Sequence, residues 1–339
     1  MKKWIPLLVL LVLAGAALWL WRSRADSSLA GPLTDFAIAD TAQVDRIFIA
    51  QKDGLTADLR RVTSPDGRYA WTVNGLPANP IPVRLLLKTF RRVEVRSPVP
   101  MSMQANVLKM MSTLAVKVEI YAGDDEPEKV WYMGHATQDH FGVFAVLELP
   151  GTGRSDRPFV LGMTGFTGVI NTRFHARLDE WRSTDVIVRP DLMQVARVQV
   201  EHPGADSAGY TLVNDRGRLS LFDATNAPLP LDTALGRDLL LHLTDAHFEY
   251  FERKITKAQR DSVLATKPWH VLTVTDVDGG STRVPFWRKD PYPGEKNAEF
   301  EPLVEDVDRM YALLDDTALV VVQRYWFDRM VPYRGQLVR

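Results

Sequence analysis

The sequence predicts an α+β protein in which an N-terminal transmembrane helix precedes two tandem, homologous units, each a mainly antiparallel sheet with covering helices. Three observations predict this architecture: an uncharged apolar run near the start, short alternating apolar segments separated by turn residues, and a set of segments that recurs in the same order. The composition agrees, since 339 residues with 46% hydrophobic and 24% charged residues are typical of a globular chain of about two domains.

The apolar run from Trp4 to Trp21 contains 18 residues without a charge. A spanning helix needs about 20 such residues, and tryptophans favour the membrane interface at both ends. A cleaved signal peptide is the alternative, but its apolar core usually has about 7–15 residues and ends at small residues. Here bulky residues follow the small ones, which favours an uncleaved anchor. The expected anchor residues are Trp4, Leu7, Leu8, Leu10, Leu11, Leu13, Leu18, Trp19 and Trp21.

The short tail before this run and the large remainder after it favour one orientation, with the tail inside and the bulk of the chain outside. We therefore expect a single-pass membrane protein with the bulk of its chain outside. Net charge is −1, which does not favour a nucleic-acid partner, because such partners usually require a basic face. The chain contains no cysteine, which excludes disulfides, zinc–thiolate sites and a cysteine nucleophile.

The segment Val116–Gly134 and the segment His270–Arg288 are both 19 residues long and both predict a hairpin with an acidic, glycine-containing turn. Five further pairs of segments match in the same order, with offsets between 150 and 156 residues. These pairs begin at Val44 and Val195, Ser64 and Asn214, Arg84 and Arg237, Val107 and Val263, and Asp156 and Asp308. Six matches at nearly one offset predict a tandem duplication. The predicted parts are an anchor (1–24), a linker (25–42), a first unit (43–190) and a second unit (191–339).

The first unit begins with strands predicted over 45–51, 57–62 and 69–73. A helix follows in which Asn79 is the N-cap and Pro80 the first residue, and its apolar face contains Val83, Leu86, Leu87 and Phe90. The pattern then predicts a strand at 93–95, a short helix over 102–111, the hairpin 116–133, strands near 142–148 and 158–161, and a closing helix over 166–180.

The second unit repeats this order. The pattern predicts strands near 195–200, 209–213 and 218–222, a helix over 232–243, a strand at 248–250, a short helix after Thr256, the hairpin 270–288, and a closing helix over 317–329. The loop 289–298 is rich in proline and charge, so we expect it to be exposed to solvent. Regular βαβ alternation is missing, which favours α+β over a doubly wound parallel sheet.

Two groups of residues are candidate metal ligands. His135, Asp139 and His140 all fall in one loop after a predicted strand, and a solvated loop is the favoured interpretation because a divalent site needs three or four converging ligands. His242, Asp245 and His247 lie around the end of a predicted helix, where helix-end electrostatics is the favoured interpretation.

The sequence contains no catalytic motif that indicates a reaction. Gly-x-Ser-x-Gly, Gly-x-Gly-x-x-Gly and Walker sequences are all missing. The acidic clusters at 124–126 and 305–308 consist of near neighbours, whereas a glycosidase needs two carboxylates that face each other across a cleft. We therefore expect no cofactor and assign no catalytic residue.

The aromatic residues have two interpretations. Trp71, Trp131 and Trp287 fall in predicted strands, where aromatic side chains commonly fill cores. The predicted last helix is apolar almost all round, and core burial is its default interpretation. A surface for a partner or a membrane is the alternative, because large apolar patches are seldom left exposed. The residues of that surface would be Val321, Tyr325, Trp326 and Phe327.

The N-terminal anchor, the start Val44-Asp45-Arg46-Ile47, the strand Trp71-Thr72-Val73 and the doubled unit resemble the bacterial domain-of-unknown-function family numbered 4340. The resemblance covers most of the chain after the linker and carries no site residues. Members of that family are often encoded beside ABC transporter subunits of the gliding-motility type. The resemblance therefore implies a bacterial inner-membrane protein whose bulk is periplasmic. It also implies an accessory role in the cell envelope, with a transporter permease or another envelope protein as partner.

Two classes of function follow from these observations. The first is a non-enzymatic, membrane-tethered scaffold or binding component of a transporter-type complex. The second is a membrane-anchored periplasmic hydrolase that acts on an envelope polymer. The first is favoured, because the sequence contains no recognisable acid–base or nucleophile arrangement.

Overall fold

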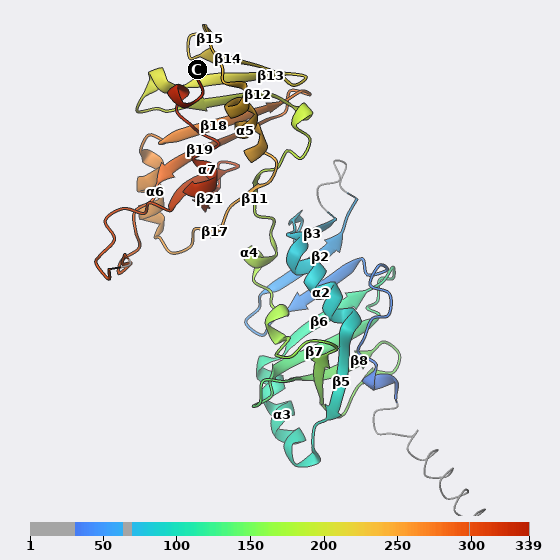
Figure 1. Cartoon of the computed structure of the whole chain (residues 1–339). Coiled ribbons are helices and arrows are strands. Elements are labelled where there is room, and N and C mark those ends of the chain that lie inside the picture. The colour runs from blue at the N-terminus through green and yellow to red at the C-terminus, as the bar shows by residue number, and fades with distance from the viewer. Residues whose placement is uncertain (1–30, 64–69, 298, 339) are drawn as a thin grey trace, which may run out of the picture. The chain divides into compact units, whose positions relative to one another are not determined.

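The computed structural model describes residues 31–63, 70–297 and 299–338. The chain divides into two compact units, Met1–Ser183 and Thr184–Arg339, which are described one at a time (Figure 1). The expected anchor Trp4–Trp21 lies outside the described residues. Within the described ranges, no helix has the length and apolar character needed to cross a membrane.

The first unit contains one large antiparallel sheet. Its strands are β1 (Arg46–Ala50), β2 (Thr56–Arg61), β3 (Trp71–Val73), β4 (Leu76–Pro77), β5 (Val93–Pro98), β6 (Val116–Tyr121), β7 (Lys129–Ala136), β8 (Val143–Leu149), β9 (Gly153–Arg154) and β10 (Phe159–Met163). The spatial order is β4-β3-β2-β1-β6-β7-β8-β10-β5, and β9 pairs with β8. The helices are α2 (Pro80–Arg92), α3 (Met101–Leu114) and α4 (Leu178–Trp181), with short 3-10 turns η1 (Pro32–Thr34) and η2 (Asn171–Arg173).

Helix α2 begins where local chemistry predicts. The side chain of Asn79 accepts a hydrogen bond from the backbone N–H of Ile81, and Pro80 occupies the first turn. A proline is tolerated there because the first N–H groups of a helix have no partner within the helix. Val83, Leu86 and Phe90 are buried, so the predicted cap and apolar face are confirmed.

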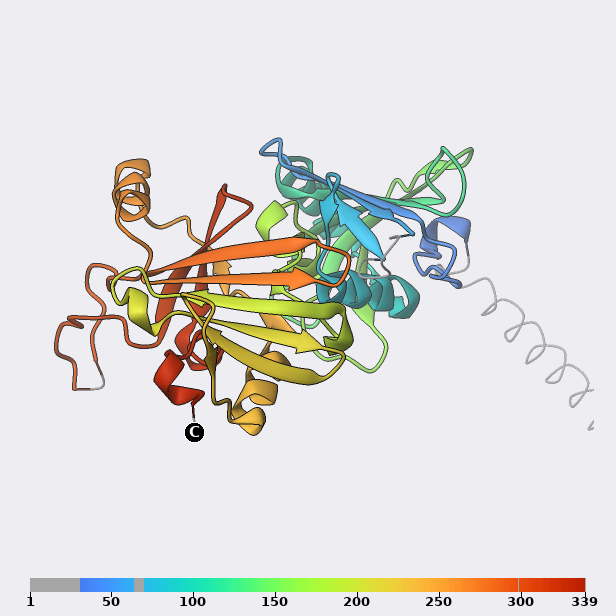
Figure 2. The same ribbon diagram turned by 90° about the horizontal axis from the view of Figure 1, so that it is seen from above.

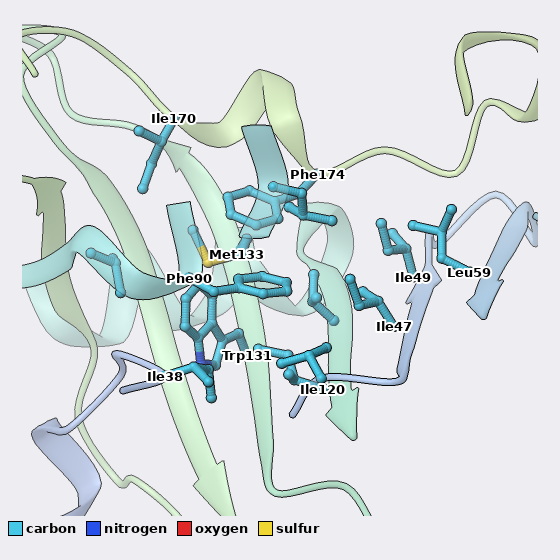
Figure 3. Packing of buried hydrophobic residues seen from close by; sticks show 14 of the residues in the cluster. Ile38, Ile47, Ile49, Leu59, Phe90, Ile120, Trp131, Met133, Ile170 and Phe174 are labelled. Atoms are coloured by element: carbon cyan, nitrogen blue, oxygen red, sulfur yellow. The ribbon is translucent and has the colours of Figure 1, made fainter. Parts of the chain in front are cut away.

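The core of the first unit lies between α2 and the sheet and is centred on Trp131 (Figure 3). This indole is completely buried, and Phe36, Phe90 and Phe174 meet it edge-on at ring-centroid distances of 5.9, 5.1 and 6.1 Å. Such edge-to-face pairs contribute about 0.5–1.5 kcal/mol each beyond the burial of apolar area. Trp71 and Trp287 are also buried, so the prediction of core tryptophans in strands is confirmed.

The second unit contains a sheet of the same form. Its strands are β12 (Val195–Glu201), β13 (Tyr210–Asp215), β14 (Arg218–Asp223), β15 (Pro228–Leu229), β17 (Tyr250–Phe251), β18 (His270–Asp276), β19 (Ser281–Arg288), β20 (Arg309–Leu314) and β21 (Ala318–Gln323). A separate pair consists of β11 (Asp185–Ile187) and β16 (Ala246–His247). The helices are α5 (Thr233–His242), α6 (Lys257–Ala265) and α7 (Arg324–Phe327), with 3-10 turns η3 (Leu192–Gln194), η4 (Asp206–Ala208) and η5 (Arg334–Gln336).

The two sheets have the same strand order. The second runs β15-β14-β13-β12-β18-β19-β20-β21-β17, which corresponds position by position to the main path of the first (Figures 1 and 2). The hairpins β6–β7 and β18–β19 occupy equivalent places, as predicted. One of the six sequence matches is misleading, however. The segments starting at Asp156 and Asp308 lead into β10 and β20, whereas β20 takes the place of β8 in the sheet.

The closing helix predicted over 166–180 is wrong. The segment contains only η2 and α4, because Gly165 and Gly168 have positive φ angles of 70° and 135° that no α-helix accommodates. Ile170 and Phe174 still reach the core, from irregular chain instead of from one helix face (Figure 3).

The closing helix predicted over 317–329 is also wrong, because its first half is the strand β21, followed by the one-turn helix α7. Val320 and Val322 join the main core, while Val321 lies in a second cluster with Trp287 and Tyr311. Successive residues of β21 are therefore buried on opposite faces of the sheet. This produces a continuous apolar run, which a buried helix would also show.

Each sheet thus has apolar clusters on both faces. In the first unit, α2 covers the main core, and α3 covers a smaller cluster on the opposite face, made of Val99, Val107, Met111, Ala115, Phe144 and Val146. The edge strands β4, β15 and β17 have two residues each, and β4 and β15 both include a proline.

Candidate binding site

A groove opens beside α3 on the side of the sheet opposite α2. We call it the α3 groove; its volume is about 520 Å³, within the range of about 300–1,000 Å³ typical of ligand sites. Its lining is mainly apolar and comes from α3, the end of β7, the turn after it, β8 and β10. The lining residues are Pro100, Ser102, Met103, Asn106, Val107, Met110, His135, Ala136, Thr137, Gln138, Asp139, Phe144 and Val160.

Helix α3 touches the sheet along a narrow line, which leaves the groove open. Only Val107 and Met111 of the helix are buried, and Pro100 at its N-cap provides no side-chain hydrogen bond. Gly134 on β7 permits the close approach, since a Cβ there would lie 3.0 Å from Cγ of Met111. The neighbouring Met103 and Met110 line the groove instead of filling the core. Methionine is unbranched and polarizable, so such side chains adapt to differently shaped apolar ligands.

His135 is one of the polar residues that line the groove. Its ring lies against Phe144, with centroids 5.0 Å apart, and its Nδ1 atom is buried without a hydrogen-bond partner among the described residues. Buried polar atoms are normally paired, and an unpaired one costs about 1–3 kcal/mol.

Asp139 lies in the turn at the rim of the groove, and its carboxylate is hydrogen-bonded within that turn. The carboxylate accepts hydrogen bonds from the hydroxyl of Thr137 and from the backbone N–H of Phe141. These bonds favour the charged form and hold the pKa of Asp139 below its ordinary value. His140 is exposed in the same turn with a φ of 57°.

The predicted metal candidates therefore have separate environments. His135 lines the groove, while Asp139 is bonded within the rim turn and His140 is exposed. In the second group, Nδ1 of His242 lies 2.8 Å from the carbonyl of Asp238, and His247 contacts Asp185 and Asp245. Across the described part of the chain, no three His, Cys, Asp or Glu residues are grouped so that they could hold a metal ion.

The corresponding place in the second unit is built differently. A hollow of about 440 Å³ lies next to α6 and β19, and its lining includes Trp269, Trp287, Lys267 and Arg288. Counted along the paired strands, Trp287 occupies the register position of Gly134. Its indole N–H donates to the carbonyl of Thr266 at the end of α6 (3.1 Å). The methionine-lined groove is therefore a property of the first unit.

The predicted partner surface near the C-terminus is mostly buried. Val321 and Phe327 are core residues, which contradicts their assignment to an exposed surface. Trp326 is half-buried and its ring lies 4.8 Å from that of His242. Tyr325, at 71% exposure, is the one member of the four that projects mainly into solvent.

Sequence reasoning did not find the α3 groove, although it predicted α3 and named His135. A usable signal was the presence of four methionines in this one helix, Met101, Met103, Met110 and Met111, more than a narrow buried face requires. No family model, curated protein or solved structure matches this chain, so the resemblance to the family numbered 4340 stays a prediction.

Proposed function

We propose that this chain is a non-enzymatic, membrane-tethered binding protein of the bacterial envelope, and that the α3 groove holds an apolar segment of a partner protein. The observation that carries the proposal is an open groove, lined by methionines, whose wall also includes His135. Ligand sites are typically concave and apolar with a few polar groups, and the α3 groove has this composition. A protein segment supplies both apolar side chains and backbone groups that can meet the histidine.

The tether rests on the sequence of Trp4–Trp21, whose length and flanking tryptophans suit a spanning helix. Full-length protein should then stay in the membrane fraction through high-salt washing. Recovery of a mature N-terminus near 23–28 would instead identify a signal peptide. The resemblance to the family numbered 4340 is the reason for proposing a transporter permease, of the ABC type, as the partner.

We also propose that the two units arose by duplication of one ancestral unit. The shared strand order supports this, together with the equivalent hairpins and the closely spaced sequence offsets. Duplicated units are free to diverge, and Gly134 and Trp287 mark one such divergence at the same register position.

The proposed binding role of the α3 groove is tested by substitutions that place charges inside and outside the groove. The double variant M103E/M110E puts two carboxylates into the groove without replacing a buried residue, whereas L114E puts one on an exposed site of the same helix. Full-length variants would be purified from detergent-solubilised membranes, and their co-purified membrane proteins quantified by mass spectrometry. We expect M103E/M110E to lose a partner about tenfold or more, because a carboxylate in an apolar site costs several kcal/mol. L114E should retain it. Equal recovery with both variants would refute the proposed site.

A further inference from the structure

The connection between β19 and β20, residues 289–308, is a long excursion that the first unit lacks. In the first unit, residues 137–142 make the equivalent connection between β7 and β8. In the second, the chain extends away from the sheet before it returns (Figures 1 and 2). We call this segment the β19–β20 loop. Long loops in compact units are uncommon and are usually either functional or linker segments, so its construction is informative.

The base of the loop is fixed by a buried ion pair. Nζ of Lys289 lies 2.7 Å from Oδ2 of Asp306, and the two side chains are 0% and 3% exposed. The other carboxylate oxygen of Asp306 accepts hydrogen bonds from the backbone N–H groups of Asp308 and Arg309. Nζ of Lys289 also lies 3.9 Å from the ring centroid of Tyr292, whose hydroxyl donates to Glu252. Both ends of the loop are thus attached to the second unit.

The outer part of the loop has hydrogen bonds of its own. The N–H of Leu303 donates to the carbonyl of Glu295, and the N–H of Asn297 donates to the carbonyl of Glu301, both at 2.9 Å. The side-chain oxygen of Asn297 accepts from the N–H groups of Glu299 and Glu301. The excursion therefore has a defined shape that can present particular side chains.

The β19–β20 loop presents apolar side chains to solvent. Phe300 is 81% exposed, Val304 is 94% exposed and Val307 is 60% exposed. Phe300 also has a φ of 63°, in the left-handed region that bulky residues rarely occupy. These side chains contribute little burial to the unit, and three of them on one loop make the loop a candidate for contact with another surface.

The negative charge of the β19–β20 loop indicates which kind of surface the loop can contact. Residues 290–308 contain seven acidic side chains and one lysine; Asp306 is paired with the buried Lys289, and Glu305 forms an exposed ion pair with Arg288 at 3.5 Å. Glu299, Glu301 and Glu305 are exposed beside the apolar residues. An anionic lipid surface would repel this loop, whereas a basic protein surface would attract it.

We propose that the β19–β20 loop is a docking element for a partner protein whose contact surface is rich in lysine and arginine and contains an apolar recess for Phe300. This surface is independent of the α3 groove, and the proposal does not rest on the function assigned to that groove.

The test uses the full-length chain in membranes with a photo-cross-linking amino acid at position 300, followed by identification of the cross-linked peptide. The matched control carries the same amino acid at position 325, since Tyr325 is also an exposed aromatic residue of the second unit. We expect position 300, and not position 325, to cross-link one protein within a surface that has an excess of lysine and arginine. The triple variant E299Q/E301Q/E305Q and an increase in salt from 50 to 500 mM should each reduce the yield several-fold.

Four results would overturn the proposal. These are cross-links to lipid, cross-links to a second copy of this chain, a partner site that is neutral or acidic, and a yield at position 300 no higher than at position 325. Limited proteolysis of each variant checks that the ion-paired base is intact, so that a loss of cross-linking reports on the contact and not on the fold of the loop.

Discussion

Replacing Lys289 by methionine should destabilise the second unit more than any surface charge change. The lysine is completely buried, and its removal leaves the carboxylate of Asp306 at 3% exposure without a cation. Breaking a buried ion pair by removing one partner costs about 3–5 kcal/mol, chiefly because the remaining charge is buried and uncompensated. The structure also indicates which second change should restore stability.

The double variant K289M/D306N removes both charges. Asparagine retains a side-chain oxygen that can accept from the N–H groups of Asp308 and Arg309, which a leucine would leave unpaired. We expect the double variant to be more stable than K289M by at least about 2 kcal/mol, since the uncompensated charge is the largest part of the penalty.

Denaturant unfolding measures these free energies, and trypsin cleavage at Lys296 reports whether the loop has opened. The matched control is R309M, which breaks the pair between Arg309 and Glu249. Those side chains are 37% and 22% exposed, so the change should cost only about 0–1 kcal/mol. The reasoning is refuted if K289M costs no more than R309M, or if K289M/D306N is no more stable than K289M.

Three further predictions concern the cores. Trp131→Ala should cost the first unit about 3–5 kcal/mol in denaturant unfolding, as the loss of a fully buried aromatic does; a cost below 1 kcal/mol would contradict the packing described. The pKa of His270 is lowered to about 3, mainly by burial and secondarily by the neighbouring His202. Between pH 6.5 and 3 the unfolded chain therefore binds a proton that the folded chain does not. Stability should therefore fall by about 1.6 kcal/mol from pH 6.5 to 5, with a shallower slope in His270→Phe, and an identical slope in that variant would exclude His270 as the cause. Trp326→Asp should lower the melting temperature of the second unit, whereas Tyr325→Ser should change its stability by about 0.5 kcal/mol or less, because only the tyrosine is mainly exposed.

The elements that could be predicted from the sequence are those fixed by local chemistry. Asn79 and Pro80 start α2, Asp232 caps α5 with bonds to two backbone N–H groups, and Thr256 forms a capping box with Gln259. Each of these signals depends on residues at most three positions apart, so the sequence alone contains it.

The elements that could not be predicted depend on tertiary contacts. The valines at 320–322 form a strand because both faces of the sheet are covered there, which the chain itself does not reveal. The α3 groove depends on how closely the helix approaches Gly134, and the buried pair of Lys289 and Asp306 joins residues at opposite ends of a loop. The exposure of the loop was predicted, whereas the burial of its first residue was not.

The short, proline-containing edges of the two sheets restrict how partners can attach. A chain that joins a sheet edge needs a row of free backbone N–H and C=O groups, and Pro77 in β4 and Pro228 in β15 have no N–H to offer. At the opposite edge of the second sheet, β17 is only two residues long. These edges resist strand addition, which also protects a sheet-rich protein from edge-to-edge aggregation at high local concentration. Recognition at these edges would therefore depend on side chains, and side-chain surfaces can change partner specificity without any change in the sheets beneath them.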